Sequence, residues 1–249
     1  MEKKELLDYV LVPLGILVMV AYHLWLLRQI IRRPATTVIG INAVNRRLWV
    51  RAMMEDTGKN GILAVQTLRN NIMASTVLAS TAIMLSSIIA VLMSSGGGGG
   101  QRAAAFNCES NNLGFSIKFF SILMCFLGAF LLNVQSIRYY SHASMLINVP
   151  SSSWNAGNKI EDFKDSVTAE YVWRTVNRGS YFWSLGLHAF YFSFPLFLWI
   201  FGAIPMFISC VVLVFLLYFL DVAADVGAVF SSVTPQDHYS VAQDQVSTL

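Results

Sequence analysis

The hydrophobic positions of this chain form long, nearly uninterrupted blocks. They do not alternate with polar positions as they would in an amphipathic helix or a half-buried strand. The blocks cover residues 9–27, 72–93, 115–134 and 181–229. A helix needs about 20 apolar residues to cross the roughly 30 Å hydrocarbon core of a bilayer. Each of the first three blocks therefore predicts one membrane-spanning helix.

The fourth block is too long for a single crossing. As one helix it would measure about 73 Å at 1.5 Å per residue. The tetrapeptide from Gly202 to Pro205 interrupts it and leaves about 20 apolar residues on either side. We predict two spans in a tight hairpin that turns at the outer surface, with one kinked helix as the alternative, because proline is tolerated within spans. The fold class is then an all-α integral membrane protein, a helical bundle of about five transmembrane helices.

Positive charge fixes the expected orientation of these spans. Of the 17 Lys and Arg residues, eight lie at 28–69 and five at 138–178. Short loops rich in Lys and Arg stay on the cytoplasmic side, so we expect the N-terminus outside and the C-terminus inside. No small-residue cleavage site follows the first block, which predicts a retained span and not a signal peptide.

Two cytoplasmic segments have helical periodicity. The first covers residues 41–54, and its apolar stripe consists of Ile41, Val44, Leu48 and Ala52. It is expected either in the inner interface plane or packed on its neighbours. Residues 57–61 (TGKNG) predict a break after it. The second segment also has a helical period, and the residues on one side of that helix are Ile160, Phe163, Val167, Tyr171 and Arg174.

The remaining organisation is simple. Residues 1–230 are expected to form one multi-span membrane domain, because too little chain lies outside the spans for a soluble domain. Nothing interrupts a helix over 61–93, and the third span is expected to continue toward residue 148. The polar tail at 231–249 is expected to be disordered.

The amino-acid composition limits the kinds of partner that the protein binds and the kinds of reaction that it carries out. Hydrophobic residues make up 55% of the chain and charged residues 12%, with a net charge of +3. The expected partners are the bilayer and its anionic headgroups at the inner surface, and no nucleic acid. We expect a multi-pass protein of the plasma membrane or an endomembrane. The absence of CxxC, HExxH and GxSxG patterns predicts no metal, no cofactor and no enzyme activity.

The second span carries the first set of candidate functional residues. One helical face holds Asn71, Ser75, Ala79, Ala82 and Ser86, and a neighbouring face holds Thr76, Ser80 and Ser87. Small residues allow helices to approach closely in lipid, so this face favours helix packing. The functional alternative is a hydroxyl-lined path for a solute, with Asn71, Ser75, Thr76 and Ser80 as candidates.

The fourth span carries the second set. Spacings of three and four place on one face Tyr181, Ser184, His188, Tyr191 and Pro195. An ionisable group at membrane depth normally faces protein or water. His188 is either a hydrogen-bonded packing residue or a proton-sensing gate, because histidine titrates near neutral pH.

The third set is charged. Asp221 and Asp225 lie four residues apart on one helical face near the inner end of the last span. They need a cationic partner, for which Arg69, Arg138 and Arg178 lie at matching depth. The alternatives are an ion-pair network that locks the inner ends together, and a cation site or charged gate.

Four tracts resemble a known family. They are residues 45–50 (NRRLWV), 68–76 (LRNNIMAST), 135–142 (QSIRYYSH) and 176–179 (VNRG). They resemble the plant and bacterial membrane family catalogued as domain of unknown function 599, over roughly residues 6–230. The resemblance implies a small multi-span protein, from a plant, and it implies no activity.

Two functions follow as hypotheses. The first is an oligomeric channel or facilitator for a small solute, with a preference for anions, because three inner arginines outnumber two aspartates. The second is a non-transporting scaffold or assembly factor that acts through the cytoplasmic amphipathic helices. A homo-oligomer is expected, because five helices enclose little interior and two spans offer small-residue faces.

Overall fold

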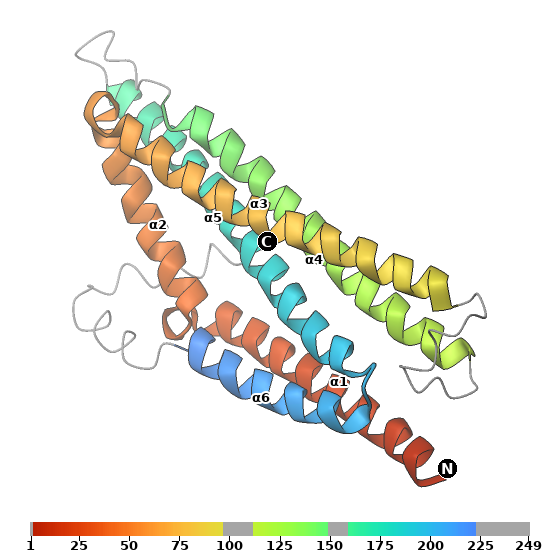
Figure 1. Cartoon of the computed structure of the whole chain (residues 1–249). Coiled ribbons are helices and arrows are strands. Elements are labelled where there is room, and N and C mark those ends of the chain that lie inside the picture. The colour runs from red at the N-terminus through yellow and green to blue at the C-terminus, as the bar shows by residue number, and fades with distance from the viewer. Residues whose placement is uncertain (1, 97–111, 149–158, 223–249) are drawn as a thin grey trace.

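The computed structural model describes residues 2–96, 112–148 and 159–222. The polar tail, Asp225 and most of the glycine run lie outside these ranges. The described chain is helical (Figure 1), and its elements are α1 (Glu2–Arg32), the short turn η1 (Pro34–Thr36), α2 (Val38–Glu55), α3 (Thr57–Gly96), α4 (Asn112–Leu146), α5 (Lys159–Leu198) and α6 (Ala203–Asp221). The predicted all-α membrane bundle is confirmed.

Four segments are long and apolar enough to cross a membrane. They are Tyr9–Arg32, Thr57–Ser94, Ser116–Leu146 and Ala203–Asp221. Only 22–28% of each spanning window is buried inside the protein, so most of each span faces outward, as contact with lipid requires. The second half of α5 does not meet the same criterion, because tyrosine, serine and histidine interrupt its apolar residues.

α5 and α6 are two helices, as the break at Gly202 predicted. Gly202 adopts a φ of 143°, a backbone conformation that side chains disfavour, and α6 begins at the next residue. The two helices run in opposite directions (Figure 1). If α6 crosses the bilayer, the second half of α5 must cross beside it. The five-span topology stays a prediction, and this hairpin supports it.

The sequence interpretation of α5 was wrong in one respect. The cytoplasmic amphipathic segment and the fourth span were expected as separate helices, whereas α5 continues through both as 40 residues. No proline separates them, and Gly179 does not end the helix. Gly179 lies against Tyr139 and Tyr140 of α4, where a Cβ atom would come within 3.2 Å of the Tyr140 ring. The glycine therefore permits a close helix crossing.

The predicted break after α2 is present, but it lies at Asp56, immediately before the residues expected to form it. The residues expected to break the helix instead begin α3, because Asp56 caps it: its Oδ1 accepts a hydrogen bond from the Lys59 backbone at 3.1 Å. α2 itself is capped by Thr37, whose hydroxyl accepts from the Gly40 backbone at 3.2 Å.

Of the predicted apolar stripe, α2 fully buries Ile41 alone. Leu48 and Ala52 are exposed, and the buried positions are Gly40, Ile41, Ala43 and Val50. Figure 1 shows α2 alongside the first half of α5. Of the two alternatives for this segment, packing on neighbouring helices is the one that the structure supports.

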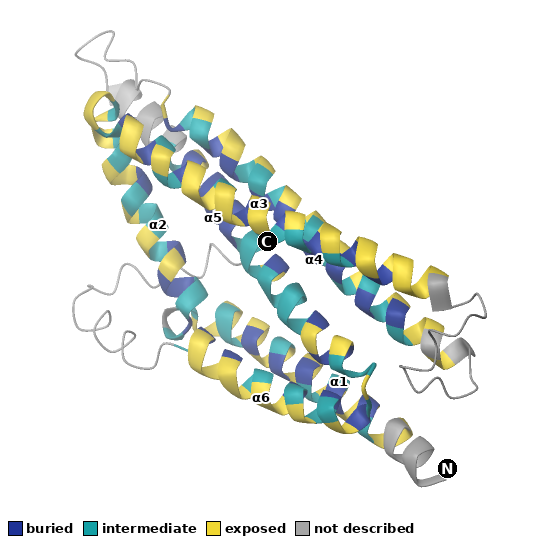
Figure 2. Ribbon diagram, viewed as in Figure 1, coloured by how far each residue is buried: buried dark blue, intermediate teal, exposed yellow. Residues whose placement is uncertain are grey.

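Three clusters of buried apolar residues hold the described part of the bundle together, and Figure 2 marks the buried positions in dark blue. The outer core joins residues from five helices: Val12, Met19, Ile89, Phe119, Ile122, Phe126, Leu196, Ala203, Met206 and Cys210. The inner core joins α2, α3, α4 and α5: Val50, Ala64, Leu68, Tyr140, Ala143, Ile147, Val172, Trp173 and Val176. A third, smaller cluster joins Tyr22 and Leu26 of α1 to Leu217 of α6. The inner core lies toward the ends of α3 and α4 that adjoin the arginine-rich segments.

Candidate functional site

The small-residue face of α3 packs against α4. Ser75 is fully buried, and its hydroxyl lies 3.2 Å from that of Ser136. Ser136 in turn donates to the Gly179 carbonyl at 2.8 Å, which joins α3, α4 and α5. Ala79 and Ala82 are buried along the same stripe. This arrangement supports the packing interpretation for Ser75.

The other α3 candidates lie outside this interface. Asn71, Thr76 and Ser80 are exposed on the surface of the subunit. The Thr76 hydroxyl donates to the Ile72 carbonyl of its own helix at 2.8 Å, a bond that satisfies a hydroxyl in apolar surroundings. These side chains could line a path only between copies of the chain. Their role in a pore stays a prediction.

Ionisable side chains from α1, α5 and α6 meet at the C-terminal end of α6. We call Tyr22, His23, His188 and Asp221 the His–Asp cluster. The Tyr22 hydroxyl of α1 donates to Asp221 Oδ2 of α6 at 2.8 Å. His188 Nε2 of α5 lies 3.6 Å from the same oxygen. The His188 ring meets the His23 ring edge-on, with centroids 5.5 Å apart.

His188 is the incompletely bonded member of the cluster. Both of its ring nitrogens are buried and lack a hydrogen bond among the described residues. His23, by contrast, places Nδ1 2.8 Å from the Met19 carbonyl. A protonated His188 would form a charged pair with Asp221, whereas a neutral ring makes only a weak contact at 3.6 Å. The cluster can therefore respond to a proton.

The expected arginine partners of Asp221 were wrong. Arg69, Arg138 and Arg178 are exposed, and within the described ranges none forms an ion pair with Asp221. Asp221 lies at the end of α6 and faces α1 and α5, so its partners are Tyr22 and His188. Of the other fourth-span candidates, Tyr191 lies beside His188 with ring centroids 6.4 Å apart. Tyr181 and Ser184 are half-buried on the same helix.

A second polar site joins α2 to α5. Arg46 of α2 donates from Nε and Nη2 to Asn177 Oδ1, at 3.2 and 2.8 Å. Burial lowers the pKa of Arg46, and the nearby Tyr140 and Tyr181 act in the opposite direction. We call Arg46, Asn177, Tyr140 and Tyr181 the inner junction.

The neighbouring Arg47 is held differently. Its Nη2 lies 3.1 Å from Glu170 Oε2, and its guanidinium lies over the Trp173 ring at 5.3 Å. Glu170 also pairs with Arg174 at 3.4 Å. Trp173 donates to the Ala43 carbonyl at 3.2 Å, which fixes α2 on α5.

Sequence reasoning missed the inner junction, although three of its four residues fall within tracts that carry the family resemblance. Arg46 belongs to the first tract, Tyr140 to the third and Asn177 to the fourth, and Ser136 of the third tract bonds to Gly179 of the fourth. These tracts are far apart in the sequence and meet at one place in the fold. A charged residue beside the apolar positions of α2 was the signal available. Its partner lies 131 positions away, so no local pattern could identify it.

Comparisons with known proteins give one match. Residues 10–226 match the model of a family described as "Protein of unknown function, DUF599". No curated protein and no solved structure matches the chain. Among the described residues, no three His, Cys, Asp or Glu side chains are placed to hold a metal ion.

Proposed function

Because the chain belongs to the DUF599 family, whose description names no activity, we propose a function from its geometry. The protein acts as an oligomeric membrane channel or facilitator for a small solute, with a preference for anions. Its conductance responds to protonation of the His–Asp cluster.

The observation that carries this proposal is the position of the cluster. Ionisable side chains within spans are expensive to bury, and by default they indicate a functional site. Asp221 and His188 lie on different helices with side chains only 12% and 13% exposed. The groups that face His188 are Asp221, Tyr22 and Tyr191 together with the second imidazole, His23.

The preference for anions rests on the inner arginines. Rings of Arg at a pore mouth favour anions, and carboxylates favour cations. Asp221 faces Tyr22 and His188, so it is not placed to neutralise Arg69, Arg138 or Arg178. Their exposed positive charge supports anion passage.

The oligomer rests on the exposed hydroxyl face of α3. Asn71, Thr76 and Ser80 face away from the subunit interior. A path lined by these groups therefore requires neighbouring copies. Chemical crosslinking and mass measurement in nanodiscs test this step, and a uniformly monomeric particle would contradict it.

Reconstituted flux tests the function. Wild-type protein in phosphatidylcholine vesicles should pass chloride down a KCl gradient, at rates that differ between pH 6 and pH 7.5. We expect His188→Gln to remove this pH dependence. The matched control is His142→Gln, because His142 is exposed on α4, and its hydrogen bond and ring contact among the described residues are both with Tyr171. An unchanged pH response in His188→Gln would exclude the cluster as the sensor.

The scaffold hypothesis remains the second candidate. The observation that favours it is the inner core, in which α2 and the first half of α5 pack against the ends of α3 and α4. Vesicles that contain assembled oligomers but pass neither ions nor small neutral solutes would support the scaffold over the facilitator.

A further inference from the structure

The half-buried guanidinium of Arg46 has no counter-charge among the side chains that the structure describes, which do not include those of residues 159–168. Its two described hydrogen bonds end on one neutral atom, Asn177 Oδ1. A charge taken out of water is costly unless an opposite charge or several hydrogen bonds compensate.

The adjacent Arg47 shows what a compensated arginine looks like in the same helix. Glu170 neutralises it, and Trp173 covers its face. Glu170 is also engaged by Arg174, so it is not available to Arg46. The two consecutive arginines are therefore held in different ways, and of the two only Arg46 keeps a charge that no described side chain neutralises.

Arg46 also keeps hydrogen-bond donors. A guanidinium carries five N–H groups, and Asn177 takes two of them. Nη1 makes no hydrogen bond with the described residues, and it is not among the buried atoms that lack a partner. That edge of the guanidinium is thus open to a ligand. Tyr181 follows Asn177 by four residues on α5, so the two side chains lie on the same face of that helix. Tyr140 is buried in the inner core beside them.

The position of this edge indicates the class of ligand. Asn177 and Tyr181 lie near the middle of α5, where its apolar half begins. The predicted five-span topology places this level near the inner membrane boundary. The fork of a guanidinium matches the oxygens of a phosphate group in two parallel hydrogen bonds. Basic pockets between spans on the cytoplasmic side are typical binding sites for anionic headgroups.

We propose that Arg46, oriented by Asn177 and assisted by the Tyr181 hydroxyl, binds a phosphate-type anion at the inner boundary of the membrane. The anion is either the headgroup of a lipid or free phosphate. The site does not depend on solute conduction, so a failure of the flux experiment leaves it standing.

The first experiment addresses free phosphate. The full-length protein is purified in a maltoside detergent, which contains no phosphate, and is titrated with inorganic phosphate in a calorimeter. The second addresses lipid. Native mass spectrometry counts the molecules of phosphatidylglycerol and phosphatidylcholine retained by the protein after exposure to an equal mixture of both.

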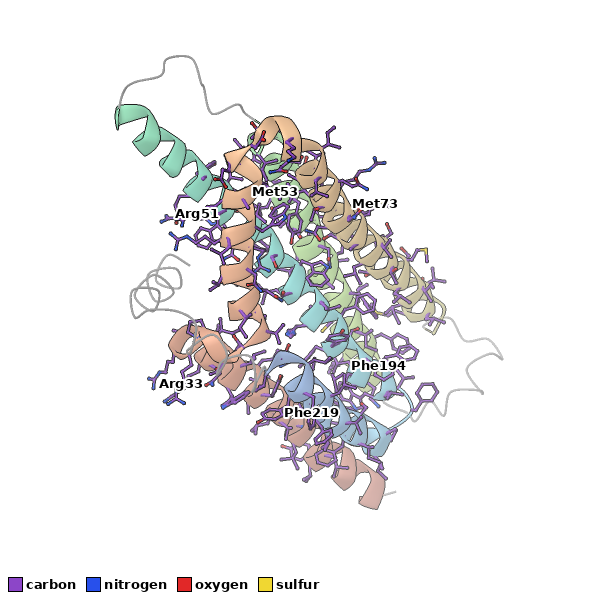
Figure 3. All side chains as sticks on the ribbon, turned by 90° about the vertical axis from the view of Figure 1, so that its left-hand side faces the viewer. Arg33, Arg51, Met53, Met73, Phe194 and Phe219 are labelled. Carbon is purple, nitrogen blue, oxygen red and sulfur yellow. The ribbon has the colours of Figure 1, made fainter. Side chains whose placement is uncertain are left out.

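Variants connect either result to the site. Arg46→Gln keeps polar donors but removes the charge, and we expect it to weaken phosphate binding, or phosphatidylglycerol retention, by about tenfold or more. Tyr181→Phe removes one hydroxyl and should weaken phosphate binding, or phosphatidylglycerol retention, several-fold. Arg51→Gln is the matched control, because Arg51 lies on the same helix and is exposed (Figure 3). It should bind as the wild type does.

Each outcome decides the proposal. Phosphate binding in detergent that Arg46→Gln abolishes identifies a free-anion site, and selective retention of phosphatidylglycerol that it abolishes identifies a headgroup site. The proposal is overturned if the wild-type protein binds neither inorganic phosphate nor phosphatidylglycerol selectively. It is also overturned if Arg46→Gln and Arg51→Gln lose binding to the same extent. Thermal unfolding of each variant accompanies the measurements, and Tyr181→Phe supplies the test if Arg46→Gln does not fold.

Discussion

Replacing Gly186 by alanine would place a methyl group inside the closest contact between α4 and α5. A Cβ atom at Gly186 would lie 2.5 Å from Asn133 Nδ2 and 3.1 Å from Asn133 Cγ. Asn133 cannot turn aside freely, because it is fully buried and donates to the Ala129 carbonyl at 2.8 Å. Either that hydrogen bond breaks or the two helices separate.

The expected loss of stability follows from two opposing effects. Adding a methyl group to a filled interface costs about 1–3 kcal/mol. Alanine is better than glycine inside a helix by about 0.5–1 kcal/mol. Gly186→Ala should therefore lose about 1–2 kcal/mol net, which at about 2–4 °C per kcal/mol lowers the unfolding midpoint by several degrees.

Gly128→Ala in α4 is the matched control. No atom lies within 4 Å of a Cβ atom built there, so this substitution should leave stability unchanged or raise it. Thermal unfolding in detergent, followed by tryptophan fluorescence at one scan rate, compares the two variants. A Gly186→Ala protein as stable as Gly128→Ala would refute the close contact. Adding Asn133→Ala to Gly186→Ala should remove part of the loss, because the colliding amide is gone.

Three further outcomes are expected. Tyr22→Phe removes the 2.8 Å hydrogen bond to the Asp221 carboxylate and should destabilise the protein by about 1.5–3 kcal/mol; no shift of the unfolding midpoint would contradict a buried, charge-assisted bond. Arg69→Ala should move the reversal potential in a KCl gradient toward lower anion preference, and a cation-selective wild type would end the anion proposal. Cysteines at Gln101 and Ile160 should react with membrane-impermeant reagents from opposite sides of the membrane, whereas labelling of both from one side would exclude the predicted topology.

The sequence alone predicted those features of the fold that depend on residues close together in the chain. Long apolar blocks predicted the spans, and a glycine–proline pair predicted the break before α6, because both depend on residues near each other in the chain. Local signals also misled. The Gly–Asn pairs at 57–61 predicted a turn, but the preceding Asp56 caps a helix there. The carboxylate one residue upstream was the stronger signal.

Features that depend on distant pairs could not be predicted from periodicity. The stripe through Leu48 satisfies a helical period, yet α2 buries Val50 and Ala43 because α5 supplies Trp173 and Asn177 to the other side. Asp221 was expected to bind an arginine of matching depth. Depth along a span says nothing about which way a side chain faces, and Asp221 faces α1.

The pairing of α1 with α6 has a consequence for biogenesis. α1 leaves the ribosome first, whereas α6, against which it packs, is the last described helix to be made. At typical rates of 5–20 residues per second, α1 waits roughly 10–40 s in the translocation machinery or in lipid before α6 is complete. During that time the Tyr22 hydroxyl lacks its partner Asp221. A chain truncated before residue 203 would keep this hydroxyl without that partner, and we expect membrane quality control to recognise the defect.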